Sequence, residues 1–182
     1  MRERAIYLSP WRIDLTIRDG VVDLPRISRL ARAACVALDA AGAPSPASIG
    51  LILADDSELA ELNRTHMAAE GPTDVLSFPL LPPTAFPAHE GSPAKPTSRR
   101  DAPFATPPGR RLNLGEIVIS VERAREQADA GRGGQTGDVR WSAGDELRLL
   151  VTHGVLHVCG WDHADPAEEA AMRSLEQRLL SG

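Results

Sequence analysis

Three of the chain's five histidines lie close together near its end, in the stretch THGVLHVCGWDH. On a helix, His153 and His157 project from one face about one turn apart, so their rings can hold one cation between them. Gly160 is suited to end such a helix, and the turn that follows can return His163 as a third ligand. The spacing therefore predicts a metal site built from three imidazoles.

The ligand set indicates which metal chemistry to expect. Three protein ligands leave one position of a tetrahedral zinc ion open, which is typical of catalytic rather than structural zinc sites. Neutral imidazoles also leave the full dipositive charge on the ion, where it attracts an anionic oxygen. Zinc is the expected ion, although three imidazoles also suit nickel or copper. Cys159 should face away from the histidines and is interpreted as a packing residue, as is Trp161.

The metzincin metalloproteases share this histidine spacing, in the motif H-E-x-x-H-x-x-G-x-x-H. There a glutamate follows the first histidine and acts as general base, whereas this chain has Gly154. A neutral peptide carbonyl benefits strongly from such a base, while a phosphodiester already carries the charge that a metal and arginines attract. Gly154 therefore counts against peptide hydrolysis.

Apolar patterns predict the elements that must position the histidines. We expect strands over residues 11–17, 48–54, 75–80 and 114–120, with the second buried on both faces. We expect helices at about 27–38, 55–63, 121–130, 142–160 and 165–180. Ser142 and Asp145 form a capping box for the histidine helix, which is apolar nearly all round and should run through the protein's middle.

The composition fits one domain over residues 1–182. Hydrophobic residues make up 42% of the chain and charged residues 25%, as in ordinary globular proteins. The N-terminal residues offer no apolar stretch for a signal peptide or a membrane span, and two cysteines form no disulfide framework, so a cytoplasmic location is expected. The net charge of -5 argues against binding nucleic acid over the whole surface, but a local basic patch stays open.

A proline-rich insertion at about 81–111 interrupts the domain. Its prolines prevent a helix or a strand ladder from propagating, so a flexible, solvated segment is expected. The alternative is a tethered basic arm that contacts phosphates. Its basic residues are Lys95, Arg99, Arg100, Arg110 and Arg111, against one acid, Asp101.

The sequence resembles the YbeY family of bacterial rRNA maturation factors. HGVLHVCGWDH is similar to the family signature H-G-x-L-H-x-x-G-[YW]-D-H. LNRTHMAAEGPTDVLSFP, residues 62–79, looks like the family block L-N-x-x-[YW]-R-x-x-x-x-P-T-[ND]-V-L-S-F-P, and LGEIVIS resembles its L-G-[DE]-I-x-I segment. The match covers most of residues 48–180 in order.

This resemblance implies a fold, an activity and partners. The fold would be α+β, a single domain with a small mixed sheet packed with helices and the metal-binding helix at the sheet. His153, His157 and His163 would be the zinc ligands. The activity would be zinc-dependent, single-strand-specific cleavage of RNA in maturation of the 3′ end of 16S rRNA and in ribosome quality control. Ribosomal particles and assembly factors would be partners, and a membrane would not.

Two residues are candidates for catalysis beside the metal. Family members commonly carry arginine after the aromatic of the second block, where this chain has His66 and Met67. Arg64, about one helical turn earlier, can take that role, or it is a solvated surface arginine. Asp162 can accept a proton, or it can accept a hydrogen bond from a ligand imidazole or a backbone amide. We favour this supporting role.

Other polar residues have two interpretations each. Thr73, Asp74 and Ser77 can line a cleft or serve the turn that enters a strand. Candidates for an RNA path are Arg123, Arg125, Arg132 and Arg140.

A metal-dependent endoribonuclease is therefore the leading hypothesis. A non-enzymatic ribosome-assembly factor with a structural metal is the stronger rival. A metalloprotease of unusual design is the weaker one.

Overall fold

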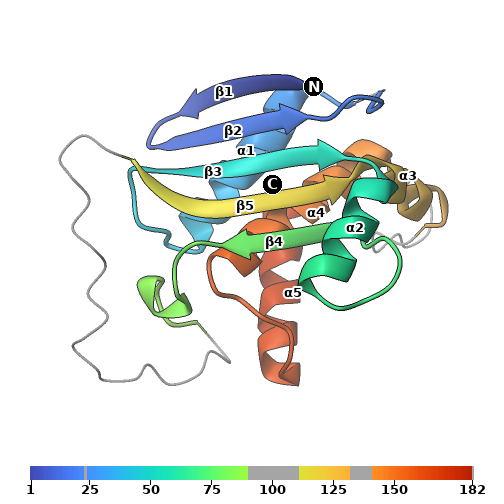
Figure 1. The fold of residues 1–182 in the computed structure, drawn as a ribbon. Coiled ribbons are helices and arrows are strands. Elements are labelled where there is room, and N and C mark those ends of the chain that lie inside the picture. Colours follow the sequence, from blue (N-terminus) through green and yellow to red (C-terminus); the bar gives the residue numbers. More distant parts are fainter. Residues whose placement is uncertain (23, 90–110, 132–140, 182) are drawn as a thin grey trace.

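One five-stranded mixed sheet organises the protein (Figure 1). The computed structural model describes residues 1–22, 24–89, 111–131 and 141–181. Along the sheet the strands run β1-β2-β3-β5-β4, where β2, β3 and β5 are parallel and the two edge strands are antiparallel to their neighbours. Their bounds are β1 Arg2–Leu8, β2 Trp11–Ile17, β3 Ala47–Ala54, β4 Val75–Pro79 and β5 Leu112–Ser120.

Helices cover both faces of this sheet, but unequally. On one face α1 and α4 pack against the strands, with α5 beyond them, while α2 lies on the opposite face (Figure 1). The helix bounds are α1 Ile27–Ala40, α2 Asp56–His66, α3 Val121–Asp129, α4 Ala143–Val158 and α5 Pro166–Ser181, and a short 3-10 helix covers Pro83–Ala85. The α+β architecture expected from the sequence is confirmed.

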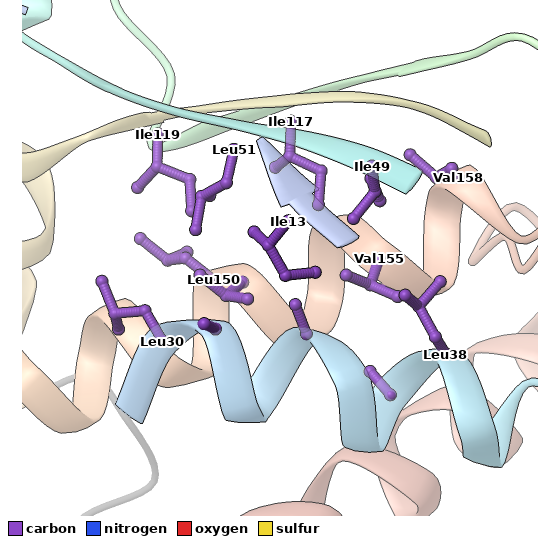
Figure 2. Packing of buried hydrophobic residues seen from close by; sticks show 14 of the residues in the cluster. Ile13, Leu30, Leu38, Ile49, Leu51, Ile117, Ile119, Leu150, Val155 and Val158 are labelled. Carbon is purple, nitrogen blue, oxygen red and sulfur yellow. The ribbon is translucent and has the colours of Figure 1, made fainter. Parts of the chain in front are cut away.

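The main core fills the space between the sheet and the helices α1 and α4. Alternate strand residues such as Ile13 and Ile117 meet Leu30 of α1 and Val155 of α4 there, all at most 1% exposed (Figure 2). Because α4 lies against this core, most of its side chains are buried, as its apolar sequence predicts. The helix that carries the histidines is therefore held firmly along the sheet.

The second face of the sheet is covered only in part. A smaller cluster joins Leu59 of α2 to Val118 and Leu76 of the strands. Ile52 of β3 points to this side and is only half-buried. The expectation that this strand is buried on both faces is therefore wrong for its second face, because α2 is short.

Strand β1 has no counterpart among the predicted elements. It pairs antiparallel with β2 at the edge of the sheet, from Arg2 opposite Ile17 to Leu8 opposite Trp11. Most of its side chains are exposed. Backbone pairing rather than apolar alternation holds it in place, so its sequence lacks the usual pattern of a half-buried strand.

The start of the proline-rich insertion is ordered and packs on the core. Phe86 is 2% exposed within the main core, and Leu81 packs against it. Arg111, at the other end, donates a hydrogen bond to the carbonyl of Pro10. Residues 90–110 lie outside the described residues, and with them most of the predicted basic arm.

Within the described residues, no helix combines the length and the apolarity needed to cross a membrane.

Candidate metal centre

The three histidines predicted from the sequence lie together at the end of α4. One ring nitrogen from each of His153, His157 and His163 falls within 4.8 Å of the other two. The Nε2 atoms of His153 and His157 are 3.0 Å apart. His153 and His157 are half-buried, whereas His163 is exposed, so the group opens to solvent on one side. The three residues could hold one metal ion.

The other ring nitrogen of each helical histidine has a fixed partner. Nδ1 of His153 is 2.7 Å from a carboxylate oxygen of Glu176 on α5. Nδ1 of His157 is 2.9 Å from the carbonyl oxygen of Trp161. Both partners can only accept, so each Nδ1 carries the hydrogen and donates it. In the neutral rings, both Nε2 atoms are then unprotonated.

When both rings are neutral, two nitrogen lone pairs therefore face one another across 3.0 Å with no hydrogen between them. Burial and the neighbouring rings of His153 and His163 lower the pKa of His157 from 6.5 to about 4, so its ring is neutral at neutral pH. Such an arrangement is repulsive unless a cation lies between the atoms. Nitrogen ligands of a tetrahedral zinc ion are about 3.3 Å apart, which is close to the separation here. The donor set therefore fits a metal ion.

A tight turn after α4 brings the third histidine back. The amide of Trp161 donates to the carbonyl of Leu156, and the amide of Gly160 donates to that of His157, the hydrogen-bond pair of a Schellman motif. Gly160 has φ +84, which glycine adopts without strain. This turn directs the chain so that His163 faces the helical pair.

Asp162 contacts the backbone beside the cluster. Its Oδ1 accepts a hydrogen bond of 2.7 Å from the amide of His163, and its own amide donates to Glu168 at 3.2 Å. These contacts match the supporting role favoured from the sequence, in which Asp162 holds the loop that carries His163.

His89, in the proline-rich segment, also reaches this loop. The ring of His89 stacks on Trp161 with the centroids 3.9 Å apart, and its Nε2 lies 3.3 Å from the carbonyl of Gly160. Glu168, 5% exposed, is 3.8 Å from the same nitrogen. Trp161 thus packs beside the cluster, as expected, with His89 against its face. Cys159 is buried, and burial raises the pKa of its thiol to about 12, in line with a packing residue.

Gly154 lies at the closest approach of α4 to the sheet. A Cβ atom there would be 2.6 Å from Cγ2 of Ile117, 3.2 Å from Cγ2 of Val75 and 3.3 Å from Oγ of Ser77. The hydroxyl of Ser77 also donates to the Gly154 carbonyl at 3.1 Å. The position that carries glutamate in metzincins therefore points into the sheet here, so no side chain on it can reach the ligand atoms.

Gly154→Ala is expected to lower the free energy of unfolding by about 1–3 kcal/mol, because the added methyl group overpacks the helix–sheet contact. Alanine's better helix propensity, about 1 kcal/mol, offsets part of this loss. Gly144→Ala in the same helix is the matched control, since the nearest atom there is 3.3 Å away on Pro25. Chemical denaturation of both variants measures the difference, and equal stability of Gly154→Ala and wild type would contradict the close contact.

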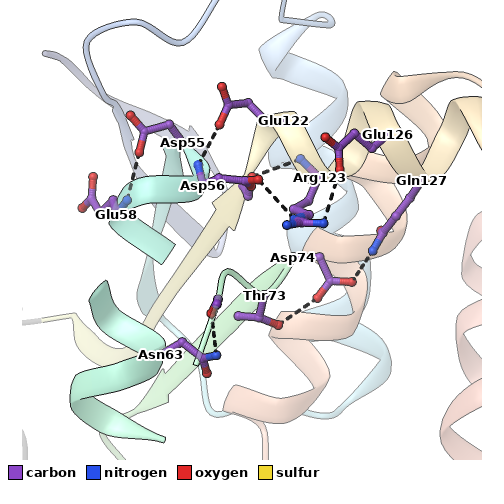
Figure 3. Close-up of polar contacts among 12 residues, drawn as sticks. Asp55, Asp56, Glu58, Asn63, Thr73, Asp74, Glu122, Arg123, Glu126 and Gln127 are labelled. Carbon is purple, nitrogen blue, oxygen red and sulfur yellow. Dashed lines mark hydrogen bonds and ion pairs between the residues drawn. The ribbon is translucent and has the colours of Figure 1, made fainter. Parts of the chain in front are cut away.

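Several polar residues considered for an RNA-binding cleft instead hold elements together (Figure 3). Asp74 accepts from the amide of Val75 at 2.9 Å and from Nε2 of Gln127 at 2.8 Å. Thr73 donates to Asp74 at 3.2 Å. These bonds tie the start of β4 to α3, so the turn interpretation accounts for Thr73 and Asp74. Ser77 likewise docks α4.

The arginines of α3 are also engaged. Arg123 pairs with Asp56 at 3.1 Å and with Glu126 at 3.3 Å (Figure 3). Arg125 donates to the carbonyl of Val22. Their placement favours a structural role over an RNA path. Arg132 and Arg140 lie outside the described residues.

Arg64 lies exposed in the last turn of α2, and Met67 follows as that helix's C-cap residue. Helix α2 covers the sheet face opposite to α4 (Figure 1). Within the described part of the chain, no hydrogen bond, ion pair or ring contact joins Arg64 to the three histidines. Its catalytic role stays a prediction.

Sequence reasoning missed Glu176 and His89. Their partners are 23 and 71 positions away for Glu176 and His89, so no local spacing reveals the contacts. One signal could have pointed to Glu176. It lies on the final helix, and the short loop after α4 brings that helix back against α4.

The mixed sheet with a histidine-bearing helix laid against it defines an α+β protein with a candidate metal centre. Residues 14–182 match the family model described as Endoribonuclease YbeY. The chain therefore belongs to the YbeY family of endoribonucleases, and the resemblance noted in its motifs is confirmed.

Individual relatives agree with this assignment. A protein named Endoribonuclease YbeY from Thermobifida fusca is 38% identical over 173 residues, covering 93% of this chain and 92% of the relative. Relatives of the same name from Salinispora tropica and Prochlorococcus marinus are 40% identical over 146 residues (80% of each chain) and 33% identical over 187 residues (99% and 78%). A solution structure of a Thermotoga maritima protein shares the fold, with a TM-score of 0.51 at 21% identity, covering 94% of this chain and 87% of that one.

Proposed function

We propose that this protein is a zinc-dependent endoribonuclease specific for single-stranded RNA, acting in maturation of the 3′ end of 16S rRNA and in ribosome quality control. Membership of the YbeY family supports the reaction class. The observation that carries the metal dependence is the 3.0 Å approach of the Nε2 atoms of His153 and His157, whose Nδ1 atoms face acceptors, with the third imidazole beside them.

In this proposal His153, His157 and His163 are the metal ligands. The bound ion would supply a Lewis acid that polarises a phosphate oxygen. Glu176 and the Trp161 carbonyl fix the tautomers and orientations of the two helical rings. Asp162 positions His163 through its backbone amide. The exposed side of the cluster, at His163, gives the RNA strand access.

We further propose that Arg64 contacts RNA phosphate from α2, and that ribosomal particles and assembly factors are partners in the cytoplasm. Two buried free thiols, Cys35 and Cys159, are consistent with a reducing compartment. The ribosomal role rests on family membership.

Cleavage of an unstructured RNA by purified, zinc-loaded protein tests the reaction. We expect cleavage of the single strand, little cleavage of the same sequence annealed to its complement, loss of activity with a chelator, and recovery on adding zinc. Elemental analysis gives the metal stoichiometry in parallel, with one ion per chain expected.

Two outcomes would favour the rival functions. An assembly factor with a structural metal would lose thermal stability and ribosome binding on chelation, while the loaded protein leaves RNA intact at stoichiometric amounts. A metalloprotease would cleave casein under the same conditions. The inward orientation of Gly154 weighs against this second outcome, since it leaves that position no side chain at the cluster.

A further inference from the structure

A groove of about 530 Å³ lies between α1, α4 and α5, on the helical side of the protein. Five arginines line it: four come from three separate helices, and Arg26 is the N-cap residue of α1. They are Arg26, Arg29, Arg32, Arg148 and Arg178, which we call the arginine groove. The chain's net charge is -5, so this concentration of positive charge is local and runs against the overall balance.

Most of this positive charge is unpaired. Arg148 lies 3.8 Å from Asp145 and donates to the carbonyl of Leu180 at 3.5 Å. The other four arginines are exposed, and within the described part of the chain none of them forms an ion pair. The first turn of α1, where Arg29 lies, carries no acidic residue. The groove therefore presents several guanidinium groups to an incoming anion.

The arginine groove and the histidine cluster share two helices. Thr152 lines the groove and directly precedes His153 on α4. On α5, Arg178 and Leu180 line the groove, while Glu176, two residues before Arg178 and therefore on the opposite side of the helix, contacts His153. Arg148 and His153 are five residues apart on α4, about 7.5 Å along its axis. The groove and the cluster therefore lie on different sides of these helices, and a single strand bound in the groove reaches the cluster by passing around them.

We propose that the arginine groove binds the phosphate backbone of RNA outside the histidine cluster and thereby holds the strand while another part of it reaches the metal. Guanidinium groups recognise phosphate through paired hydrogen bonds, and a row of them suits a polymer with one charge per unit. Arg26, the N-cap residue of α1, and Arg29 and Arg32 within that helix recur every three positions and form such a row. This inference rests on the proposed function for the choice of RNA over an acidic protein.

Binding of a fluorescein-labelled oligouridine of about 20 nucleotides, longer than a typical single-strand site, tests the proposal by anisotropy in metal-free protein, where no cleavage occurs. The test variant is Arg29→Gln/Arg32→Gln. The matched control is Arg2→Gln/Arg4→Gln on the exposed edge strand β1, because both variants remove two positive charges and take the net charge from -5 to -7.

We expect the groove variant to bind about tenfold more weakly at low salt, and its log–log salt slope to fall by about 1.4, since each phosphate contact on a single strand accounts for about 0.7. The control should bind like wild type. Equal weakening of both variants would overturn the proposal, because net charge alone would then explain binding. Polyglutamate that competes as strongly as oligouridine of equal charge would overturn it too, because the groove would then not select phosphate.

Cleavage assays separate this proposal from the proposed function. If the groove is an RNA contact, the groove variant should cleave a tetranucleotide at the wild-type rate and a long RNA more slowly at low substrate concentration. Wild-type protein that binds RNA through the groove but never cleaves it would refute the proposed nuclease function, while the proposed RNA contact at the groove would stand. If the groove variant cleaves RNA normally and binds it as wild type does, only the proposed RNA contact at the groove would be refuted.

Discussion

His157→Ala is expected to weaken metal binding severely and to abolish RNA cleavage while leaving a folded chain. His157 is the middle ring of the cluster, with ring centroids 4.5 Å from His153 and 5.0 Å from His163. Its removal leaves only two imidazole nitrogens, those of His153 and His163, to coordinate the metal. Losing a residue that only hydrogen-bonds to a metal ligand lowers metal affinity by up to about 100-fold. Losing the ligand itself should lower it by more than that. Competition with a chromophoric chelator measures the affinity.

The fold should tolerate this change, because the variant leaves the buried face of α4 unaltered. His66→Ala is the matched control, since His66 lies on α2, where it contacts Phe78 edge-on. It should retain metal affinity and cleavage. Circular dichroism checks that both variants remain folded. Cleavage that survives in His157→Ala would mean that the activity does not depend on the cluster.

The parts of the site that sequence alone predicts are those encoded by local spacing. His153, His157 and the turn at Gly160 lie on one helix and its cap, so helical geometry places them without knowledge of the rest of the fold. The capping box of Ser142 and Asp145 is likewise local, and both of its hydrogen bonds form. These features were predicted because each depends on neighbours within one or two turns.

Features that depend on tertiary contacts were not predictable in this way. Gly154 was interpreted from the sequence as a missing base, yet its physical role is to let α4 approach Ile117. The charge of Arg123 suggested RNA, but Asp56, far away in sequence, neutralises it. Strand β1 depends on pairing with β2 rather than on its own pattern. In each case a partner distant in sequence decides the role.

Among these contacts between residues distant in sequence, the one made by Glu176 matters most for the metal centre. Its carboxylate accepts the Nδ1 hydrogen of His153 at 2.7 Å and is only 12% exposed. A carboxylate behind a ligand imidazole fixes the tautomer, orients the ring and raises the basicity of the nitrogen that binds the metal. Helix α5 therefore contributes to the site although it carries none of the ligands.

Glu176→Ala is expected to weaken metal binding by about 10–100-fold, the usual cost of losing such a partner. Glu176→Gln should fall between this variant and wild type, because its amide oxygen still accepts the hydrogen bond but carries no charge. Glu169→Gln, on the same helix and paired with Arg173 at 2.6 Å, is the control and should bind metal like wild type. Chelator competition gives the affinities, and nitrogen chemical shifts of His153 report its tautomer.

The order of these variants distinguishes an orienting role from a merely structural one. If Glu176 only stabilised the packing of α5 on α4, thermal stability would fall while the metal affinity of the folded fraction and the His153 tautomer stayed unchanged. If it orients the ligand, Glu176→Ala should populate the other tautomer, in which Nδ1 is unprotonated and Nε2 carries the hydrogen. That tautomer cannot bind the metal through Nε2, so the loss of affinity and the tautomer shift should rise together across the series.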